Sequence, residues 1–103
     1  MTPSRRTLAD TYPQLEAFFC GYLHQDFPEA HGDLAGAVAA FRRDASAAER
    51  RAVRREWNTY RGEAMAATLD AIGEQLSTGL GSAWVPRRRV DLEALDALLS
   101  GLR

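Results

Sequence analysis

Apolar side chains recur every three or four residues along most of the chain. The clearest stripe has the members Leu15, Phe18, Phe19, Tyr22 and Leu23. This spacing places them on one face of an amphipathic helix. Thr11 can cap that helix, and Pro13 suits its opening turn, where an N–H would have no partner. We expect Phe27-Pro28 to end it, because a residue before proline is pushed away from helical angles.

The same period predicts a second and a third helix. Asp33 can cap the second helix, whose apolar face is Leu34, Ala37, Val38 and Phe41. Ser46 and Glu49 have the spacing of a capping box, so the third helix begins there. Its inward residues are Val53, Trp57 and Tyr60.

A further apolar stripe contains Ala64, Met65, Thr68, Leu69, Ile72 and Leu76. Residues 46–77 therefore form either one long helix or two. We favour two helices joined near Gly62, because glycine weakens a helix interior. Gly79 and Gly81 are stop signals, and residues 82–86 form an irregular segment that is expected to lay Trp84 over the core.

The last helix is predicted to begin at Val90 and Asp91. Its inward residues are Leu92, Leu95, Leu99 and Leu102, while Glu93 and Asp96 face out. No segment alternates as a strand would, and each stripe can be buried only against another helix. The sequence therefore predicts an all-α fold, a compact antiparallel bundle of about five helices. We expect one domain over residues 1–103, with residues 1–9 flexible.

Composition narrows the setting. The chain is 46% hydrophobic and has four prolines, which is typical of a globular protein. No apolar run approaches the roughly 20 residues that span a bilayer, and no secretory signal is evident, so we expect a cytoplasmic protein without a membrane partner. Cys20 is the only cysteine, which excludes an internal disulfide and a zinc site of paired cysteines. We interpret it as a small packing residue.

The charges are distributed unevenly, although the formal net charge is only −1. Residues 7–41 contain no arginine and five acidic residues: Asp10, Glu16, Asp26, Glu29 and Asp33. Residues 42–61 hold seven arginines against three acidic residues. Such asymmetry can steer a charged partner.

The densest chemistry lies at the end of the first predicted helix, in Gly21-Tyr22-Leu23-His24-Gln25-Asp26-Phe27. With Tyr12-Pro13-x-Leu15, this segment resembles the Tyr-Pro-x-Leu…Gly-Tyr-Phe-His-Gln-Asp-Trp signature of immunity proteins from contact-dependent growth inhibition systems. Leu23 and Phe27 depart from it but keep its apolar character. The resemblance is best from Tyr12 to about Trp57. It implies a cytoplasmic protein that binds the C-terminal toxin domain of a large secreted effector and blocks it by occlusion.

Two interpretations of this cluster stay open. In one, Tyr22, Leu23 and Phe27 are core residues, while His24, Gln25 and Asp26 cap the helix end. In the other, the polar members join Glu29 and Asp33 in an acidic rim that pairs with basic residues of a toxin. The predicted partner-binding residues are Tyr22, His24, Gln25, Asp26, Glu29 and Asp33.

A metal or catalytic site has weaker support. His24, Asp26 and His31 are residue types that bind zinc or a similar ion, but their spacing matches no standard ligand pattern. The chain also lacks a nucleophile elbow, a phosphate loop and a plausible Cys–His pair. We therefore expect no enzyme, no metal and no cofactor.

The alternative function is a small helical nucleic-acid-binding or regulatory protein. Its basis is the array Arg50, Arg51, Arg54 and Arg55, whose members four residues apart share a helix face and could grip phosphates. A solvated face is the simpler interpretation, because the pI is near 6.1 and nucleic-acid modules are usually basic. Arg87-Arg88-Arg89 is interpreted in the same way. These arginines could also face an acidic patch on a toxin.

Overall fold

The computed structural model describes residues 8–25, 32–64 and 67–102, and these ranges contain helices and no strand. The elements are α1 (Leu8–Thr11), α2 (Pro13–Tyr22), α4 (Leu34–Asp44), α5 (Ala47–Ala64), α6 (Leu69–Glu74), the π-helical turn η1 (Gln75–Gly79) and α7 (Arg89–Ser100). The predicted all-α fold is confirmed. No helix in these ranges has the length and apolar character needed to cross a bilayer. Residues 1–7 of the segment expected to be flexible lie outside the description, and Leu8 and Ala9 belong to α1.

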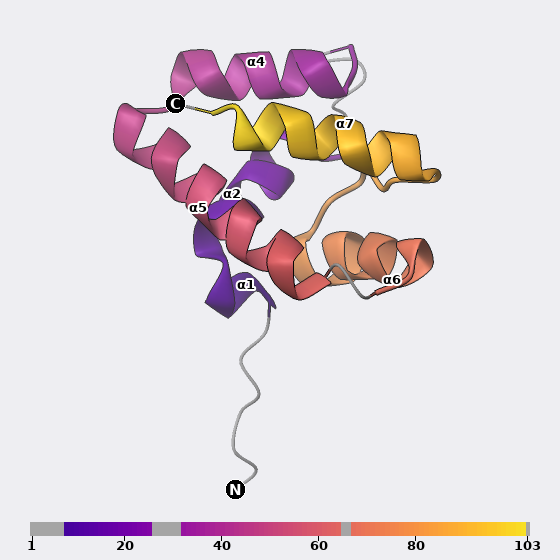
Figure 1. Cartoon of the computed structure of the whole chain (residues 1–103). Coiled ribbons are helices and arrows are strands. Elements are labelled where there is room, and N and C mark those ends of the chain that lie inside the picture. Colours follow the sequence, from indigo (N-terminus) through magenta and orange to yellow (C-terminus); the bar gives the residue numbers. More distant parts are fainter. Residues whose placement is uncertain (1–7, 26–31, 65–66, 103) are drawn as a thin grey trace, which may run out of the picture.

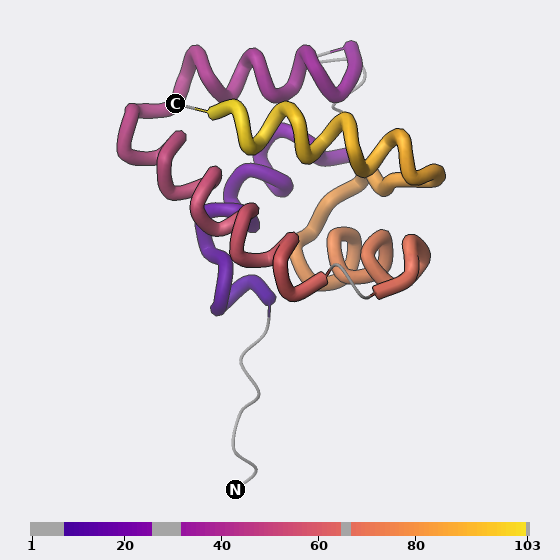
Figure 2. The backbone as a smooth tube through the Cα atoms, in the orientation of Figure 1, coloured from indigo at the N-terminus to yellow at the C-terminus, as the bar shows by residue number. Residues whose placement is uncertain are grey.

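Helix α5 contacts both α2 and α7, so it joins two sides of the molecule. In Figure 1, α4 and α7 run in the same direction at the top, and α5 crosses below them in the opposite sense. Figure 2 shows α2 passing behind α5. The largest fully buried side chains between these helices are Trp57, Phe18, Phe19, Leu15, Leu23, Leu76, Leu80, Leu95, Leu99 and Leu102. Burial of each such side chain contributes about 1.5–3 kcal/mol.

The start of α2 is held by side chains from α5. The N-cap residue is Tyr12, not Thr11, and Pro13 occupies the first turn as expected. Tyr12 has no capping side chain of the usual kind, and Glu56 Oε1 instead accepts the N–H groups of Gln14 and Leu15 at 2.9 and 3.1 Å. The Tyr12 hydroxyl donates to Glu63 Oε2 at 2.7 Å. A carboxylate at this position also complements the helix dipole.

Helix α2 ends at Tyr22, before the expected stop at Phe27-Pro28, which lies outside the described residues. A continuing helix would use the Leu23 carbonyl as an acceptor within the helix. That carbonyl instead accepts the N–H of Ala83 at 2.7 Å. This contact ties the end of α2 to a residue 60 positions along the chain, and His24 and Gln25 lie in the turn after α2.

The starts of α4 and α5 agree with the sequence. Asp33 Oδ1 accepts the Gly36 N–H at 2.8 Å, which confirms it as the N-cap of α4. The Ser46 hydroxyl accepts the Glu49 N–H at 3.1 Å, and Glu49 Oε1 accepts the Ser46 N–H at 3.2 Å. The predicted capping box is therefore confirmed.

The stretch from 46 to 77 forms two helices, as favoured, but they do not meet at Gly62. Helix α5 continues through this glycine to Ala64, and α6 begins at Leu69. The Thr68 side chain accepts the Ala71 N–H at 3.1 Å, so Thr68 caps α6 and is not part of an inward stripe. Met65 lies outside the described residues.

Two glycines close the next segment, as predicted. Gly79 ends η1, and a Cβ there would lie 2.5 Å from Leu8 Cδ1, so glycine lets α1 pack closely. Gly81 has φ +74°, a conformation that other residues rarely adopt. Trp84 then packs against the core, which confirms its expected position.

Helix α7 begins one residue earlier than expected, at Arg89. Leu95 and Leu99, together with Leu102 just beyond the helix, are fully buried, and Glu93 is exposed. The expectation that Asp96 faces solvent is wrong. Its carboxylate points to α5 and accepts hydrogen bonds from Trp57 and Arg61.

Candidate functional site

Tyr22, the aromatic member of the predicted partner-binding set, is half-buried between α2 and α4. Its ring stacks on Phe18 with centroids 6.0 Å apart and meets Phe41 edge-on at 5.4 Å. Its hydroxyl donates to Asp44 Oδ2 at 3.2 Å. Burial, and then the bond to Asp44, raise the pKa of Tyr22 above its ordinary value. Tyr22 thus joins two helices, as the core interpretation of the cluster expects.

Three of the other five members of that set lie in the described part of the chain, and they differ in exposure. His24 is half-buried, and Gln25 and Asp33 are exposed, although Asp33 also caps α4. Asp26 and Glu29 lie outside the described residues. Among the described members, Gln25 and Asp33 are therefore the most accessible to a partner.

A hollow of about 390 Å³ opens between α5, α6 and α7, away from the predicted set. Its apolar lining is Trp57, Tyr60, Ala64, Ile72 and Leu92. Its charged lining is Arg61, Arg89, Glu93 and Asp96. We refer to this hollow as the α5–α7 groove. No local motif marks it, because its walls come from three helices separated in the sequence.

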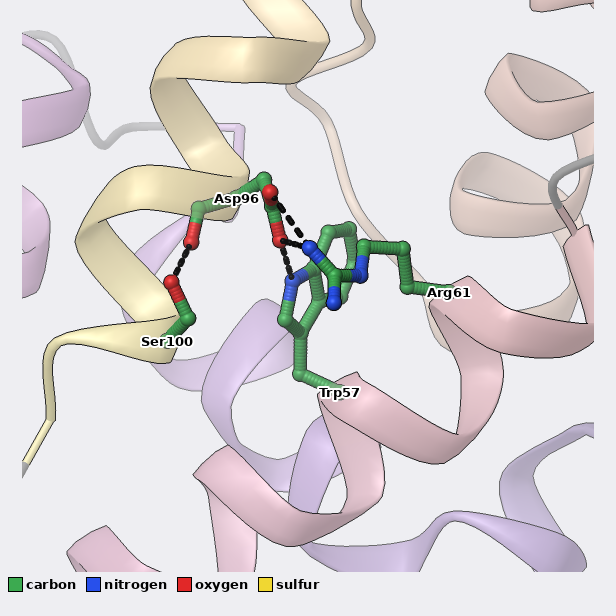
Figure 3. A network of polar contacts seen from close by, with 4 residues as sticks. All are labelled: Trp57, Arg61, Asp96 and Ser100. Atoms are coloured by element: carbon green, nitrogen blue, oxygen red, sulfur yellow. Dashed lines mark hydrogen bonds and ion pairs between the residues drawn. The ribbon is translucent and has the colours of Figure 1, made fainter.

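A polar network forms one wall of the α5–α7 groove (Figure 3). Asp96 Oδ1 accepts the indole N–H of Trp57 at 2.9 Å. Arg61 Nη1 contacts the two Asp96 oxygens at 3.0 and 2.8 Å. The Ser100 hydroxyl donates to the Asp96 backbone carbonyl at 2.6 Å. These bonds fix the Arg61 guanidinium at the mouth of the groove while half of its side chain stays exposed.

Comparison with protein families supplies the identity. A family model described as CdiI immunity protein matches residues 11–86. The chain belongs to this family. Comparison with curated proteins and with solved structures found no significant match.

Membership defines an immunity protein whose partner is a toxin, and proteins of this kind are typically not enzymes. The matched range includes both segments of the resemblance, from Tyr12-Pro13 to the turn after α2. It ends at Pro86, before α7. The family match therefore covers the predicted partner-binding residues but not the α7 wall of the α5–α7 groove.

Only part of the hypothetical metal set of this immunity protein, His24, Asp26 and His31, lies in the described part of the chain. His24 is described, whereas Asp26 and His31 are not. Within the described ranges, no three His, Cys, Asp or Glu side chains are grouped so that they could hold a metal ion. The three-residue set stays untested.

The arginine array on α5 is only partly a free basic face. Arg50 Nη1 donates to the carbonyls of Ala45 and Arg42 at 2.7 and 3.2 Å, so Arg50 closes the C-terminal end of α4. Arg51 and Arg55 are exposed, and Arg54 is half-buried. Of the four arginines in the array, Arg51, Arg54 and Arg55 can therefore face a partner.

Tyr12, Cys20 and Tyr60, like Tyr22, have raised pKa values. Burial raises the pKa of Tyr60 to about 12, and its hydroxyl donates to Gln75 Oε1 at 2.7 Å. Burial, followed by the bond to Glu63, raises the pKa of Tyr12 to about 12 as well. Cys20 is exposed as a residue, yet its sulfur lies 3.5 Å from the Leu80 carbonyl, and desolvation with nearby Glu16 raises its pKa. A raised pKa disfavours the reactive thiolate.

Proposed function

We propose that this immunity protein binds the C-terminal toxin domain of a contact-dependent growth inhibition effector and blocks it by covering its active site. The observation that carries the proposal is the family match over residues 11–86. Occlusion requires a well-packed surface of defined shape and charge, and no chemistry. The packed helices α2, α4 and α5 supply such a scaffold.

The proposed contact surface is an acidic rim formed by His24, Gln25, Asp26, Glu29 and Asp33. Gln25 and Asp33 are exposed, which supports their part in it. Tyr22 supports the rim from below, because its ring and hydroxyl are engaged with α4. The rim lies in the stretch 7–41, which has no arginine.

The negative charge of the rim favours a toxin with a basic surface. A toxin that cleaves nucleic acid needs a basic cleft to hold phosphates, and an acidic surface complements such a cleft. Opposite potentials speed encounter and set the orientation of the complex. Because the Debye length is only about 10 Å at 0.1 M salt and shortens as salt is added, toxin affinity should fall as salt rises.

The test combines three substitutions in the rim, Asp26→Lys, Glu29→Lys and Asp33→Asn. Asparagine is chosen at position 33 because it keeps the N-cap of α4 and removes only the charge, whereas loss of the cap would cost about 1 kcal/mol. The probe is the C-terminal domain of the large secreted protein that we expect in the neighbouring reading frame, titrated by calorimetry. We expect the triple variant to bind roughly tenfold or more weakly, with unchanged helicity.

A matched control changes a similar amount of charge elsewhere. Asp70→Lys with Glu74→Lys alters two exposed residues of α6, outside the rim. We expect its affinity to stay within about threefold of the unaltered protein, since distant exposed charges are screened. Equal affinity of the rim variant and the unaltered protein would contradict the rim. Failure of the unaltered protein to bind would contradict the proposed function.

A further inference from the structure

We propose that the α5–α7 groove is a second docking site for the same toxin, one that holds an apolar toxin side chain lying next to a carboxylate. The inference rests on the proposed function, because the partner is the same molecule. It assigns a place on the surface that the signature at the end of α2 does not include. It also assigns the chemistry of the segment that binds there.

The shape and lining of the groove favour an apolar side chain. Its volume of about 390 Å³ is within the range of ligand pockets, roughly 300–1,000 Å³. Trp57 and Tyr60 form its floor, and Ala64, Ile72 and Leu92 add aliphatic surface. Filling such a hollow removes apolar surface from water on both molecules, which is how anchor residues stabilise protein interfaces.

Two charged side chains at the mouth are uncommitted. Within the described part of the chain, the side chains of Arg89 and Glu93 have no hydrogen bond or ion pair, although they stand four residues apart on α7. The order arginine before glutamate is the less favourable one for such a pair, because it opposes the helix dipole. Arg89 is exposed and lines the groove, so its guanidinium is available to a partner.

The charge around Arg89 selects an acidic partner group. Arg87, Arg88 and Arg89 gather at the N-terminal end of α7, where the dipole disfavours cations. Asp91 offsets part of this charge: its Oδ2 accepts the backbone N–H groups of Arg87 and Arg88, and its Oδ1 lies 3.8 Å from Arg88 Nη2. Over residues 87–93 the three arginines exceed the two acidic residues, Asp91 and Glu93, by one positive charge. A toxin carboxylate beside Arg89 would offset this excess while the neighbouring apolar side chain enters the groove.

Two substitutions test the groove independently. Arg89→Glu reverses the charge at its mouth on an exposed residue, and glutamate suits the first turn of a helix. Ala64→Leu adds bulk at a residue that lines the hollow. Their matched controls are Arg42→Glu in α4 and Ala48→Leu in α5, the same changes at exposed positions outside the groove. Circular dichroism and the thermal midpoint verify that each variant is folded.

The probe is again the purified toxin domain expected in the neighbouring reading frame, titrated by calorimetry. We expect Arg89→Glu and Ala64→Leu each to raise Kd roughly tenfold or more, and both controls to stay within about threefold. If the unaltered protein and a folded Arg89→Glu variant bind equally well, the groove is not a docking site, and the proposed function stands. If the controls weaken binding as much as the groove variants, the groove inference is likewise overturned. If the unaltered protein does not bind the toxin, both proposals fail together.

Discussion

Aromatic side chains form both the junction of α2 with α4 and the floor of the α5–α7 groove. In the junction they pack closely on one another, whereas in the groove they border an open hollow. At the junction, the rings of Phe18, Tyr22 and Phe41 pack on one another with centroids 5.2–6.0 Å apart. At the groove, the ring centroids of Trp57 and Tyr60 lie 5.7 Å apart, but both rings line an open hollow of about 390 Å³. One aromatic cluster is closed and the other is open.

The comparison separates residues that hold the fold from residues that are available to a partner. In the junction, the Tyr22 hydroxyl is bonded to Asp44, so even its polar atom is engaged. In the groove, Arg89 and Glu93 are exposed, and apolar surface lies beside them. A resemblance centred on the junction therefore reports in part how the molecule is built, and a binding surface can lie elsewhere.

The largest effect is expected from opening the closed junction. Phe18→Ala should lower the free energy of unfolding by about 3–5 kcal/mol, because Phe18 is fully buried and touches three other rings. Phe18→Leu, which keeps most of the volume, should cost no more than about 1.5 kcal/mol. Urea denaturation measures both values. Equal losses for the two variants would show that the junction is not closely packed.

The second effect is a loss of stability at high pH through the groove floor. An unfolded tyrosine loses its proton near pH 10, whereas folded Tyr60 keeps it to about pH 12. The folded state therefore binds more protons between these values, and the free energy of unfolding falls as pH rises. We expect Tyr60 to account for about 2 kcal/mol of that loss, with some allowance for solvent screening. Denaturation of Tyr60→Phe from pH 9 to 12 should show a shallower decline than the unaltered protein; an equally steep decline would contradict the assignment.

A smaller effect is expected at the groove wall. Asp96→Asn keeps an acceptor for the Trp57 indole N–H but removes the ion pair with Arg61, whose side chain is 49% exposed. Partly exposed pairs are worth roughly 0.5–1 kcal/mol, so the variant should be less stable by about that amount. Glu93→Gln is the control, because Glu93 makes no ion pair with Arg89 four residues away. It should change stability by less than about 0.5 kcal/mol. Thermal unfolding of both variants makes the comparison, and equal stabilities would show that the Arg61–Asp96 pair contributes nothing.

The smallest effect is expected from the Tyr22 hydroxyl. Tyr22→Phe removes a 3.2 Å bond at the surface and leaves the ring contacts intact, so the stability loss should be about 0.5 kcal/mol or less. Toxin affinity should also stay within about threefold, since this hydroxyl is engaged with Asp44. A large loss of affinity with normal stability would instead make Tyr22 a direct toxin contact.

Features set by neighbouring residues could be predicted from the sequence. The N-cap at Asp33 and the capping box of Ser46 and Glu49 depend on side chains three residues from their partners, and both are present. The apolar stripes identified most of the buried leucines and aromatic residues in the same way. Helical period and capping chemistry therefore accounted for the fold class.

Features set by distant residues could not be predicted. The residue after α2, Leu23, accepts the Ala83 N–H through its carbonyl, and the start of α2 is capped by Glu56 of α5, more than 40 residues along the chain. Asp96 was expected to face solvent, yet it lies beside the apolar stripe, four residues after Leu92, and α5 brings Trp57 and Arg61 to it. The α5–α7 groove depends on this packing, so no motif could reveal it.

Growth protection tests the central claim most directly. Cells would produce the toxin domain expected in the neighbouring reading frame, either alone or together with the immunity protein at a comparable level. The account predicts that the unaltered protein restores growth, and that the rim variant with Asp26→Lys, Glu29→Lys and Asp33→Asn protects poorly although it is folded. Continued growth arrest in the presence of the folded, unaltered protein would contradict the account.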